Sequence, residues 1–329
     1  MKVAIYGQFY HQNSEKYVQQ LLDALEKKNI EVFIEENFLE IIRENEVIKK
    51  EYNQFEVFTQ LDNSYDLFFS IGGDGTILKS VNYVKDLDIP IVGINTGRLG
   101  FLATIQKEEI SETISSILQK NYTISERELL TIATTPKNDS LSDVNFALNE
   151  ITVSRKNTTS MITINTWLDD KYLTAYWADG LIITTPTGST GYSLSCGGPV
   201  ITPETNALAL TPIAPHNLNA RPLVIPNKTK IKLEVSGRAG EYLVSLDSRL
   251  TTLEENSTIY IEKAPFTIGL VSLNEEYAPF EVKVSNIQEL WQVTSKLTFS
   301  LDANSENSML RQLQASMEEL KSQLNSFKR

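Results

Sequence analysis

A glycine-rich turn around a single aspartate is the segment of this chain best suited to chemistry. It reads Gly72-Gly73-Asp74-Gly75-Thr76 and lies between a strand-like run at 67–69 and a helix-like run at 77–81. The glycines let the backbone present successive N–H groups to an anion, and the positive end of the helix points at the same place. A carboxylate in such a phosphate cradle would repel the ligand, so we expect Asp74 to handle a proton or a metal ion. Taken alone, the segment is more simply a turn closed by an aspartate hydrogen bond.

Two shorter polar segments accompany this turn. One places an arginine between two glycines just beyond an apolar run at 89–94, and reads Asn95-Thr96-Gly97-Arg98-Leu99-Gly100-Phe101-Leu102. By itself it is a loop with a solvated arginine. The other, Asn149-Glu150, interrupts an apolar run, and an amide beside a carboxylate can hold the hydroxyls of a ribose. The solvent face of an edge strand would explain the same pair equally well.

The longest polar segment extends from Trp177 to Pro199. A strand-like run, Leu181 to Thr185, leads into a dense set of threonine, serine and glycine residues with one tyrosine. Hydroxyls and backbone N–H groups at that density indicate a neutral polar pocket, and Tyr192 can cover a flat ring. A tight turn would explain only a few of these residues.

The residue inventory removes several other chemistries. The chain has no Gly-x-x-x-x-Gly-Lys-Ser/Thr and no Gly-x-Gly-x-x-Gly, so neither a P-loop nor a Rossmann cofactor site is predicted. The run from Gly191 to Ser195 lacks the closing glycine of a nucleophile elbow. With only His11 and His216, a serine or cysteine hydrolase has few candidate bases, and no Cys/His cluster indicates zinc.

Alternating strands and helices must position the first two segments. We expect strands at 2–6, 30–34, 66–71 and 89–94. We also expect a helix capped by Asn13 or Ser14, a charged helical stretch at 38–52, and a helix that follows Asp74 and ends near residue 83. Near-continuous apolar strands of this kind predict an α/β domain with a parallel sheet and helices on both faces. Ligands bind at the carboxyl ends of such strands, where Asp74 and Asn95 are expected to lie.

The sequence changes in character after about Arg127, where short β-rich runs of Thr, Ile and Val alternate with polar turns, and we expect strands at 144–153, 258–261 and 266–271 among them. This predicts a mostly-β second domain. The expected domains are 1–127, 128–285 and a C-terminal segment at 286–329. In the last of these an a/d heptad seam predicts a helix, which is either a surface helix or a subunit contact, and its residues are Leu310, Leu313, Met317, Leu320, Leu324 and Phe327.

Length and composition bound the class of protein. The 329 residues are enough for two domains, and 41% hydrophobic with 22% charged residues is an ordinary globular composition. A net charge of −12 argues against a nucleic-acid or anionic-membrane partner. The single cysteine, Cys196, fits a reducing compartment, and neither a signal peptide nor a spanning segment is predicted. We therefore expect a cytoplasmic protein.

Taken together and in this order, the polar segments resemble those of the ATP-NAD kinases, and the bacterial branch most. The Gly-Gly-Asp-Gly-Thr turn is shared with diacylglycerol, sphingosine and 6-phosphofructokinase-like kinases, whereas the segments at 95–102, 149–150 and 179–190 are more specific. The resemblance covers about residues 1–273. It implies an N-terminal α/β domain, a β-rich C-terminal domain, an active site between them, and a homodimer or homotetramer. The family's usual closing segment is only loosely echoed at 290–299.

The resemblance also implies a role for each matching position. Asp74 is similar to the family's proton acceptor for the 2′-hydroxyl of the NAD adenosine ribose, and Lys79 would lie near the donor phosphates. Asn149 and Glu150 would bind ribose hydroxyls. The remaining implied binding residues are Gly72, Gly73, Gly75 and Thr76 of the turn, Asn95, and, for NAD, Asp179, Thr190, Gly191, Tyr192, Ser193, Leu194, Ser195, Ala214 and Arg249. Position 191 is usually alanine in the family.

The implied activity is transfer of the γ-phosphoryl of ATP to NAD to give NADP, with Mg²⁺ accompanying the ATP and no metal ligand assigned to a protein side chain. Backbone N–H groups and the metal would neutralise the charge on the moving phosphoryl group. Two alternatives stay open. One is a lipid or sugar kinase that shares only the Gly-Gly-Asp-Gly turn, and the other is a non-catalytic NAD-binding regulator.

Overall fold

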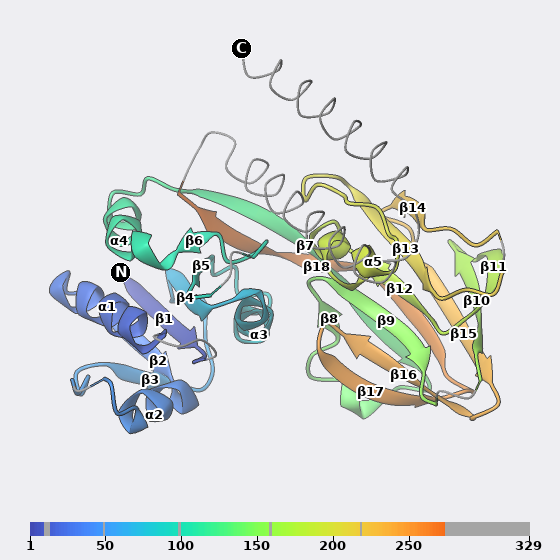
Figure 1. The fold of residues 1–329 in the computed structure, drawn as a ribbon, viewed down its shortest axis with the longest axis horizontal. Helices are drawn as coiled ribbons and strands as arrows, with labels where there is room; N and C mark the ends of the chain where they lie inside the picture. Colours follow the sequence, from blue (N-terminus) through green and yellow to red (C-terminus); the bar gives the residue numbers. More distant parts are fainter. Residues whose placement is uncertain (10–13, 49, 98–99, 158–159, 218, 274–329) are drawn as a thin grey trace, which may run out of the picture. The chain divides into compact units, whose positions relative to one another are not determined.

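A parallel sheet with helices packed on it forms the N-terminal part of the protein (Figure 1). The computed structural model describes residues 1–9, 14–48, 50–97, 100–157, 160–217 and 219–273. The strands lie in the order β5-β4-β1-β2-β3, each parallel to its neighbours, and a short strand, β6, continues beyond β5. They are β1 (Lys2–Gly7), β2 (Glu31–Glu35), β3 (Glu56–Phe58), β4 (Leu67–Gly72), β5 (Ile91–Asn95) and β6 (Ile105–Gln106). Every residue of β4 and β5 is buried, as expected for a sheet covered on both faces.

The helices of this part follow the predicted apolar spacing. Helix α1 buries Val18, Leu21, Leu22 and Leu25 along one face. The others are α2 (Glu36–Glu44), α3 (Asp74–Val84) and α4 (Ile110–Leu118), with α1 at Ser14–Lys27 and a 3₁₀ turn, η1 (Lys107–Glu109), before α4. Helix α3 packs on β4 and β5, so the Asp74 turn lies between a buried strand and the helix that covers it.

Antiparallel strands build the C-terminal part. One sheet has the order β14-β13-β12-β9-β16-β17. Its strands are β9 (Glu150–Arg155), β12 (Gly180–Thr184), β13 (Ala207–Ile213), β14 (Leu223–Pro226), β16 (Glu241–Leu246) and β17 (Arg249–Glu254). The other strands of this part are β7 (Thr123–Thr135), β8 (Phe146–Ala147), β10 (Ile162–Leu168), β11 (Lys171–Ala178), β15 (Ile231–Gly237) and β18 (Thr258–Ser272). Three short helices interrupt them, η2 (Asp139–Leu141), η3 (Thr187–Thr190) and α5 (Tyr192–Ser195).

Strand β18 joins the two parts within one continuous sheet. It pairs with β15 and β7 in the antiparallel sense and with β5 in the parallel sense, where Leu270 lies opposite Ile91. Two hydrophobic cores meet along its partner β7, which contributes Leu129 to the N-terminal core and Leu130 to the C-terminal core. Successive side chains of a strand point to opposite faces, so one strand supports both cores.

Three local predictions were wrong. The helix expected at 38–52 ends at Glu44, because the Asn45 side chain accepts hydrogen bonds from the backbone N–H groups of Val47 and Ile48 and turns the chain. The strand expected at 144–153 is broken into β8 and β9. The runs expected separately at 258–261 and 266–271 are one strand, β18, with an irregular register between Lys263 and Thr267. The heptad helix, His11 and the segment at 290–299 lie outside the described residues.

A substitution at Gly93 in β5 tests how closely the sheet packs against α3 and the loop that follows β5. An added Cβ would lie 2.6 Å from Ile77 Cδ1 and 3.3 Å from the Leu102 carbonyl oxygen. We expect Gly93→Ala to lower the free energy of unfolding by about 1–3 kcal/mol, measured by urea denaturation. Gly75→Ala is the matched control, because a Cβ there meets no atom within 4 Å and alanine favours the helix. Equal urea midpoints for the two variants would contradict the close packing.

Candidate active site

The carboxylate of Asp74 is fixed by three consecutive backbone N–H groups. Phe101 donates to Oδ2 at 2.8 Å, and Leu102 and Ala103 donate to Oδ1, each at 3.0 Å. These donors come from the loop between β5 and β6, some 27 residues further along the chain, so the two loop segments predicted from the sequence meet at this side chain. Residues 101–103 lie in a loop, outside any strand or helix, so the carboxylate also gives their N–H groups hydrogen-bond partners that they would otherwise lack.

The residues around this loop explain why it fits so closely. A Cβ on Gly100 would lie 2.1 Å from Asp74 Oδ1, so only glycine leaves room for the carboxylate. Asn95 is 1% exposed; its Oδ1 accepts from the Gly97 N–H at 2.8 Å and its Nδ2 donates to the Ala103 carbonyl at 3.4 Å. Asn95 thus shapes the loop that holds Asp74.

The first turn of α3 is open to a ligand. A Cβ on Gly73 or Gly75 would meet no atom within 4 Å, so packing does not require glycine at either position. Gly73 is the N-cap and provides no side-chain capping bond, which leaves N–H groups of the first turn available to an anion. Buried hydroxyls beside this turn have no hydrogen-bond partner among the described residues, namely Ser70 Oγ, Thr76 Oγ1 and Thr96 Oγ1. Lys79 is exposed on the same helix.

The Asn149–Glu150 pair lies where the backbone passes from β8 to β9. The Asn149 carbonyl accepts from the Thr185 N–H at 2.9 Å and from the Thr184 hydroxyl at 3.1 Å. The Thr185 hydroxyl donates to the Leu148 carbonyl at 2.7 Å. A Cβ on Gly188 would lie 2.2 Å from the Asn149 carbonyl oxygen. The threonines and glycine of the long polar segment therefore fix this backbone.

Glu150 is a buried acid with an unsatisfied oxygen. Glu150 is only 9% exposed, and its Oε2 has no hydrogen-bond partner among the residues that the structure describes. Burial, and then the negative charge of Asp247, raise the pKa of Glu150 from 4.5 to about 8. Burial raises the pKa of Asp247 too, but three backbone hydrogen bonds and Arg249 oppose that rise. Asp247 meets three N–H donors, which suit its charged form, and Glu150 Oε2 meets none among the described residues, so we assign the proton of this pair to Glu150.

The residues at 190–195 differ in how far they are buried. Ser193 is buried and its hydroxyl bonds to that of Thr211 at 2.8 Å, whereas Tyr192 is 47% exposed at the start of α5. Gly191 lies against the acid, since a Cβ there would be 3.3 Å from Glu150 Oε2. Thr190 and Leu194 are half-buried and Ser195 is exposed. The segment thus reaches Glu150 on one side and solvent on the other.

Asp179 and Ala214 line a hollow of about 500 Å³. Asp179 forms an ion pair with Arg155 at 3.0 Å, and the rings of Trp177 and His216 lie 4.9 Å apart, centroid to centroid, on the same hollow. Arg155 was not predicted, because nothing in its own segment distinguishes it. An aromatic pair beside charged groups of both signs suits a flat, polar ligand.

Arg249 lies in a position that the sequence could not reveal. Its guanidinium donates to the carbonyl oxygens of Val144, at 3.1 Å, and Phe146, and lies over the Phe146 ring. Burial lowers the pKa of Arg249, against the opposing charge of Asp247. The side chain therefore holds backbone that leads to the Asn149–Glu150 pair.

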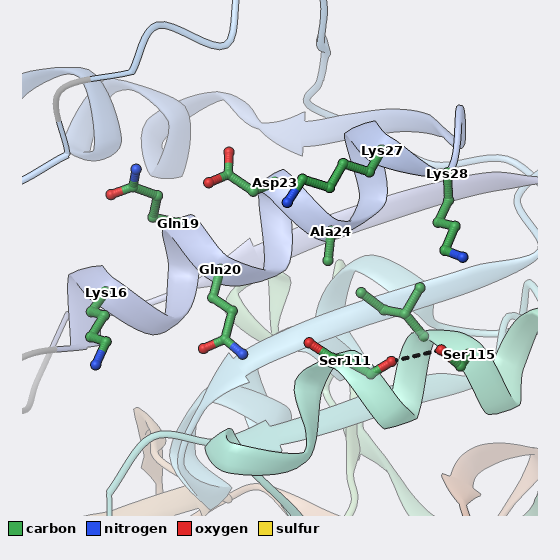
Figure 2. A pocket seen from close by; sticks show the side chains of 10 residues that line it. Lys16, Gln19, Gln20, Asp23, Ala24, Lys27, Lys28, Ser111 and Ser115 are labelled. Carbon is green, nitrogen blue, oxygen red and sulfur yellow. Dashed lines mark hydrogen bonds between the residues drawn. The ribbon is translucent and has the colours of Figure 1, made fainter.

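A second hollow, also of about 500 Å³, lies on the surface between α1 and α4 and contains none of the predicted residues (Figure 2). Polar and charged side chains line most of it, including Lys16, Asp23 and Ser111. Among the described residues, no three or more His, Cys, Asp or Glu side chains are grouped to hold a metal ion. None of the described helices is long and apolar enough to cross a membrane.

The fold and these sites define a two-domain nucleotide-kinase class, with an N-terminal α/β domain and a mostly-β C-terminal domain. Residues 3–122 match the ATP-NAD kinase N-terminal domain, and residues 148–273 match the ATP-NAD kinase C-terminal domain. The chain belongs to the ATP-NAD kinase family.

Several relatives support this assignment. The chain is 64% identical over 273 residues to the NAD kinase of Christiangramia forsetii, which covers 83% of this chain and 93% of the relative. It is 54% identical to the NAD kinase of Flavobacterium psychrophilum, over 84% and 94% of the two chains. Among solved structures, the NAD kinase from Archaeoglobus fulgidus in complex with ATP matches with a TM-score of 0.65 at 27% identity, over 84% and 95%. Yeast NADH kinase complexed with NADH shares the fold, with a TM-score of 0.75 at 24% identity, over 88% and 87%.

The buried acid makes stability depend on pH. Folded Glu150 keeps its proton up to about pH 8, whereas the unfolded chain releases it near 4.5, so the stability gained is complete below pH 4.5 and is lost as pH rises toward 8. We expect this residue to lower the free energy of unfolding by up to about 1.4 kcal/mol per pH unit in that window.

Urea denaturation of the wild type and of Glu150→Gln across this pH range measures the effect. The variant should lack the part of the slope that Glu150 contributes, while Glu254→Gln, a change at an exposed glutamate, should keep it. Identical slopes for wild type and Glu150→Gln would show that Glu150 is ionised in the folded protein.

Proposed function

We propose that the protein is an NAD kinase, which transfers the γ-phosphoryl group of ATP to the 2′-hydroxyl of the adenosine ribose of NAD and forms NADP. The observation that carries this proposal is the Asp74 carboxylate, fixed by three N–H groups beside the open first turn of α3. Family membership and relatives named NAD kinase support the choice of substrates.

In this proposal Asp74 accepts the proton of the ribose hydroxyl. A carboxylate has about four lone-pair positions, and three N–H groups occupy three of them, so about one remains for the hydroxyl. An aspartate is a weak base for an alcohol, so accurate orientation of the hydroxyl toward the phosphorus contributes more than basicity.

The donor phosphates are assigned to the turn that Asp74 opens. The N–H groups of Gly73 and Gly75, with the positive end of α3, would hold phosphate oxygens, and Lys79 would add a positive charge. The orphaned hydroxyls of Thr76 and Thr96 would find partners on the same oxygens. Mg²⁺ would arrive bound to ATP and neutralise charge on the phosphates, since the oxygens of Asp74 already face N–H donors.

The C-terminal domain would bind NAD. Asn149 and Glu150 are assigned to ribose oxygens, with protonated Glu150 donating a hydrogen bond to an acceptor on the substrate. Asp179, Ala214 and the exposed ring of Tyr192 are assigned to the rest of the dinucleotide, in or beside the hollow that Trp177 lines. Arg249 serves the same site through the backbone that it holds.

The wider organisation follows the same proposal. Residues 1–127 would form the donor domain, 128–285 the NAD domain and 286–329 a C-terminal segment. We further propose a cytoplasmic homo-oligomer, either a dimer or a tetramer, without a nucleic-acid or membrane partner.

Purified protein with ATP, Mg²⁺ and NAD tests the function, with NADP detected by a coupled NADP-specific dehydrogenase. We expect NADP to form, and Asp74→Asn to lower kcat by about 10²–10⁴-fold while NAD binding in calorimetry survives. Asp86→Asn, at an exposed aspartate, is the matched control and should keep full activity. NAD binding without NADP would identify a regulator instead, and no NADP with turnover of a lipid or sugar would identify another kinase of the Gly-Gly-Asp-Gly group. Unchanged kcat in Asp74→Asn would show that Asp74 is not the proton acceptor.

Two glycine variants separate the donor site from the acceptor base. Gly73→Ala adds a methyl group where only a ligand would lie, so we expect KM for ATP to rise on the order of tenfold, with a loss of stability of about 1 kcal/mol from the poorer N-cap. Gly100→Ala pushes on Asp74 and should lower kcat by about 10²-fold, because a displacement of about 1 Å costs that much. Steady-state kinetics and thermal unfolding of both variants measure this. An unaltered KM for ATP in Gly73→Ala would show that the ATP phosphates do not bind at this turn.

A further inference from the structure

The turn between β16 and β17 holds the Asn149–Glu150 pair from a distant part of the chain. We propose that Asp247, at this turn, is a positioning residue for NAD: its carboxylate fixes the backbone from which Asn149 and Glu150 reach the substrate. This inference rests on the proposed function, since it assigns a role to the support of the same NAD site.

Asp247 contacts three consecutive N–H groups, as Asp74 does. Asn149 and Glu150 donate to Oδ1 at 2.8 and 3.2 Å, and Leu148 donates to Oδ2 at 3.0 Å. The Asp247 N–H returns a bond to the Glu150 carbonyl at 3.0 Å. These residues are 97–99 positions apart in the sequence. The four bonds replace the strand pairing that is lost between β8 and β9.

The turn itself is held in one conformation. Asp247 has a φ of 53°, a left-handed geometry that aspartate and asparagine tolerate better than most residues, and its carbonyl accepts from the Ser245 hydroxyl at 2.7 Å. Arg249, two residues later, bonds to the carbonyls of Val144 and Phe146. This short turn thus binds both kinds of backbone group in the segment 144–150: the Asp247 carboxylate accepts from N–H groups, and the Arg249 guanidinium donates to carbonyl oxygens.

The other side of the same backbone is equally fixed. Thr184 and Thr185 hold the carbonyls of Leu148 and Asn149, and Gly188 packs against the latter. The peptide groups that precede Glu150 therefore have partners on both sides. Only the side chains of the pair keep freedom to meet a ligand, and Glu150 Oε2 is the oxygen left without a partner among the described residues.

The charge of Asp247 adds a second effect to the geometry. It lies beside Glu150 and favours the protonated form of that acid, so that Glu150 can donate a hydrogen bond to NAD. Among the described residues, Glu150 also interacts with Tyr192, on which Cys196 and Asp179 act in turn. A change at Asp247 should therefore alter both the position and the proton of Glu150.

Three variants of one turn test this role: Asp247→Ala removes the acceptor, Asp247→Asn keeps the shape but loses the charge and one acceptor oxygen, and Ser248→Ala is the exposed neighbouring control. We expect Asp247→Ala to raise KM for NAD more than tenfold while KM for ATP changes less than twofold. Asp247→Asn should raise KM for NAD less. NAD affinity should fall at alkaline pH, as Glu150 loses its proton, and Asp247→Asn should move that fall to lower pH by at least half a unit. Adding Glu150→Gln, which donates at every pH, should abolish that loss.

The outcomes separate this inference from the proposed function. If Ser248→Ala and wild type form NADP but both Asp247 variants keep the wild-type KM for NAD, or lose NAD and ATP affinity equally with a lower melting temperature, Asp247 has only a structural role. If wild type forms no NADP, the proposed function fails, and calorimetry of NAD binding to the same variants decides the role of Asp247. Equal NAD affinity, or no NAD binding at all, would then overturn it.

Discussion

Carboxylates that accept three consecutive backbone N–H groups hold together the parts of this protein that could do chemistry. Asp74 does so with residues 101–103, and Asp247 does so with residues 148–150. Both loops leave a strand, so their N–H groups lose ladder partners and would otherwise be unpaired away from water. An ionised carboxylate is the strongest available acceptor for such groups. Each loop is consequently rigid at the point where it presents a side chain or an open backbone.

This constraint explains which features the sequence could predict. The strands and helices of the N-terminal domain follow from local periodicity, and Asp74 was recognisable because the glycines that surround it are adjacent in the chain. Its partners at 101–103 belong to the next predicted loop, and parallel topology brings such loops to one edge. Family resemblance supplied the rest of the implied site, including Asn149, Glu150 and Asp179. The family and the two-domain fold are confirmed, while the individual roles stay predictions.

What the sequence could not predict depends on contacts between distant residues. Asp247 lies in an unremarkable turn, and its importance exists only because that turn meets residues 148–150. The same contact breaks the strand expected at 144–153, so a single long-range interaction accounts for a missed residue and a wrong element. Arg249 was singled out for NAD, yet its donors face the carbonyls of Val144 and Phe146. The early end of α2 is different, because the local side chain of Asn45 competed successfully with the helix.

The two acids of the proposed site, Asp74 and Glu150, are set apart by their surroundings. Asp74 meets three N–H donors, an environment that suits an acceptor, whereas Glu150 is buried beside another carboxylate and Oε2 meets no donor among the described residues. An acid placed in that way keeps its proton and becomes a donor. In the proposed site, one acid could then accept a proton from a ribose hydroxyl while the other donates a hydrogen bond to the substrate at the same pH. The difference comes first from the burial of Glu150, and then from Asp247, which binds the backbone around Glu150 and lies beside its side chain. As a support for the backbone of the pair, Asp247 would thereby help to keep Glu150 a donor while Asp74 acts as the base.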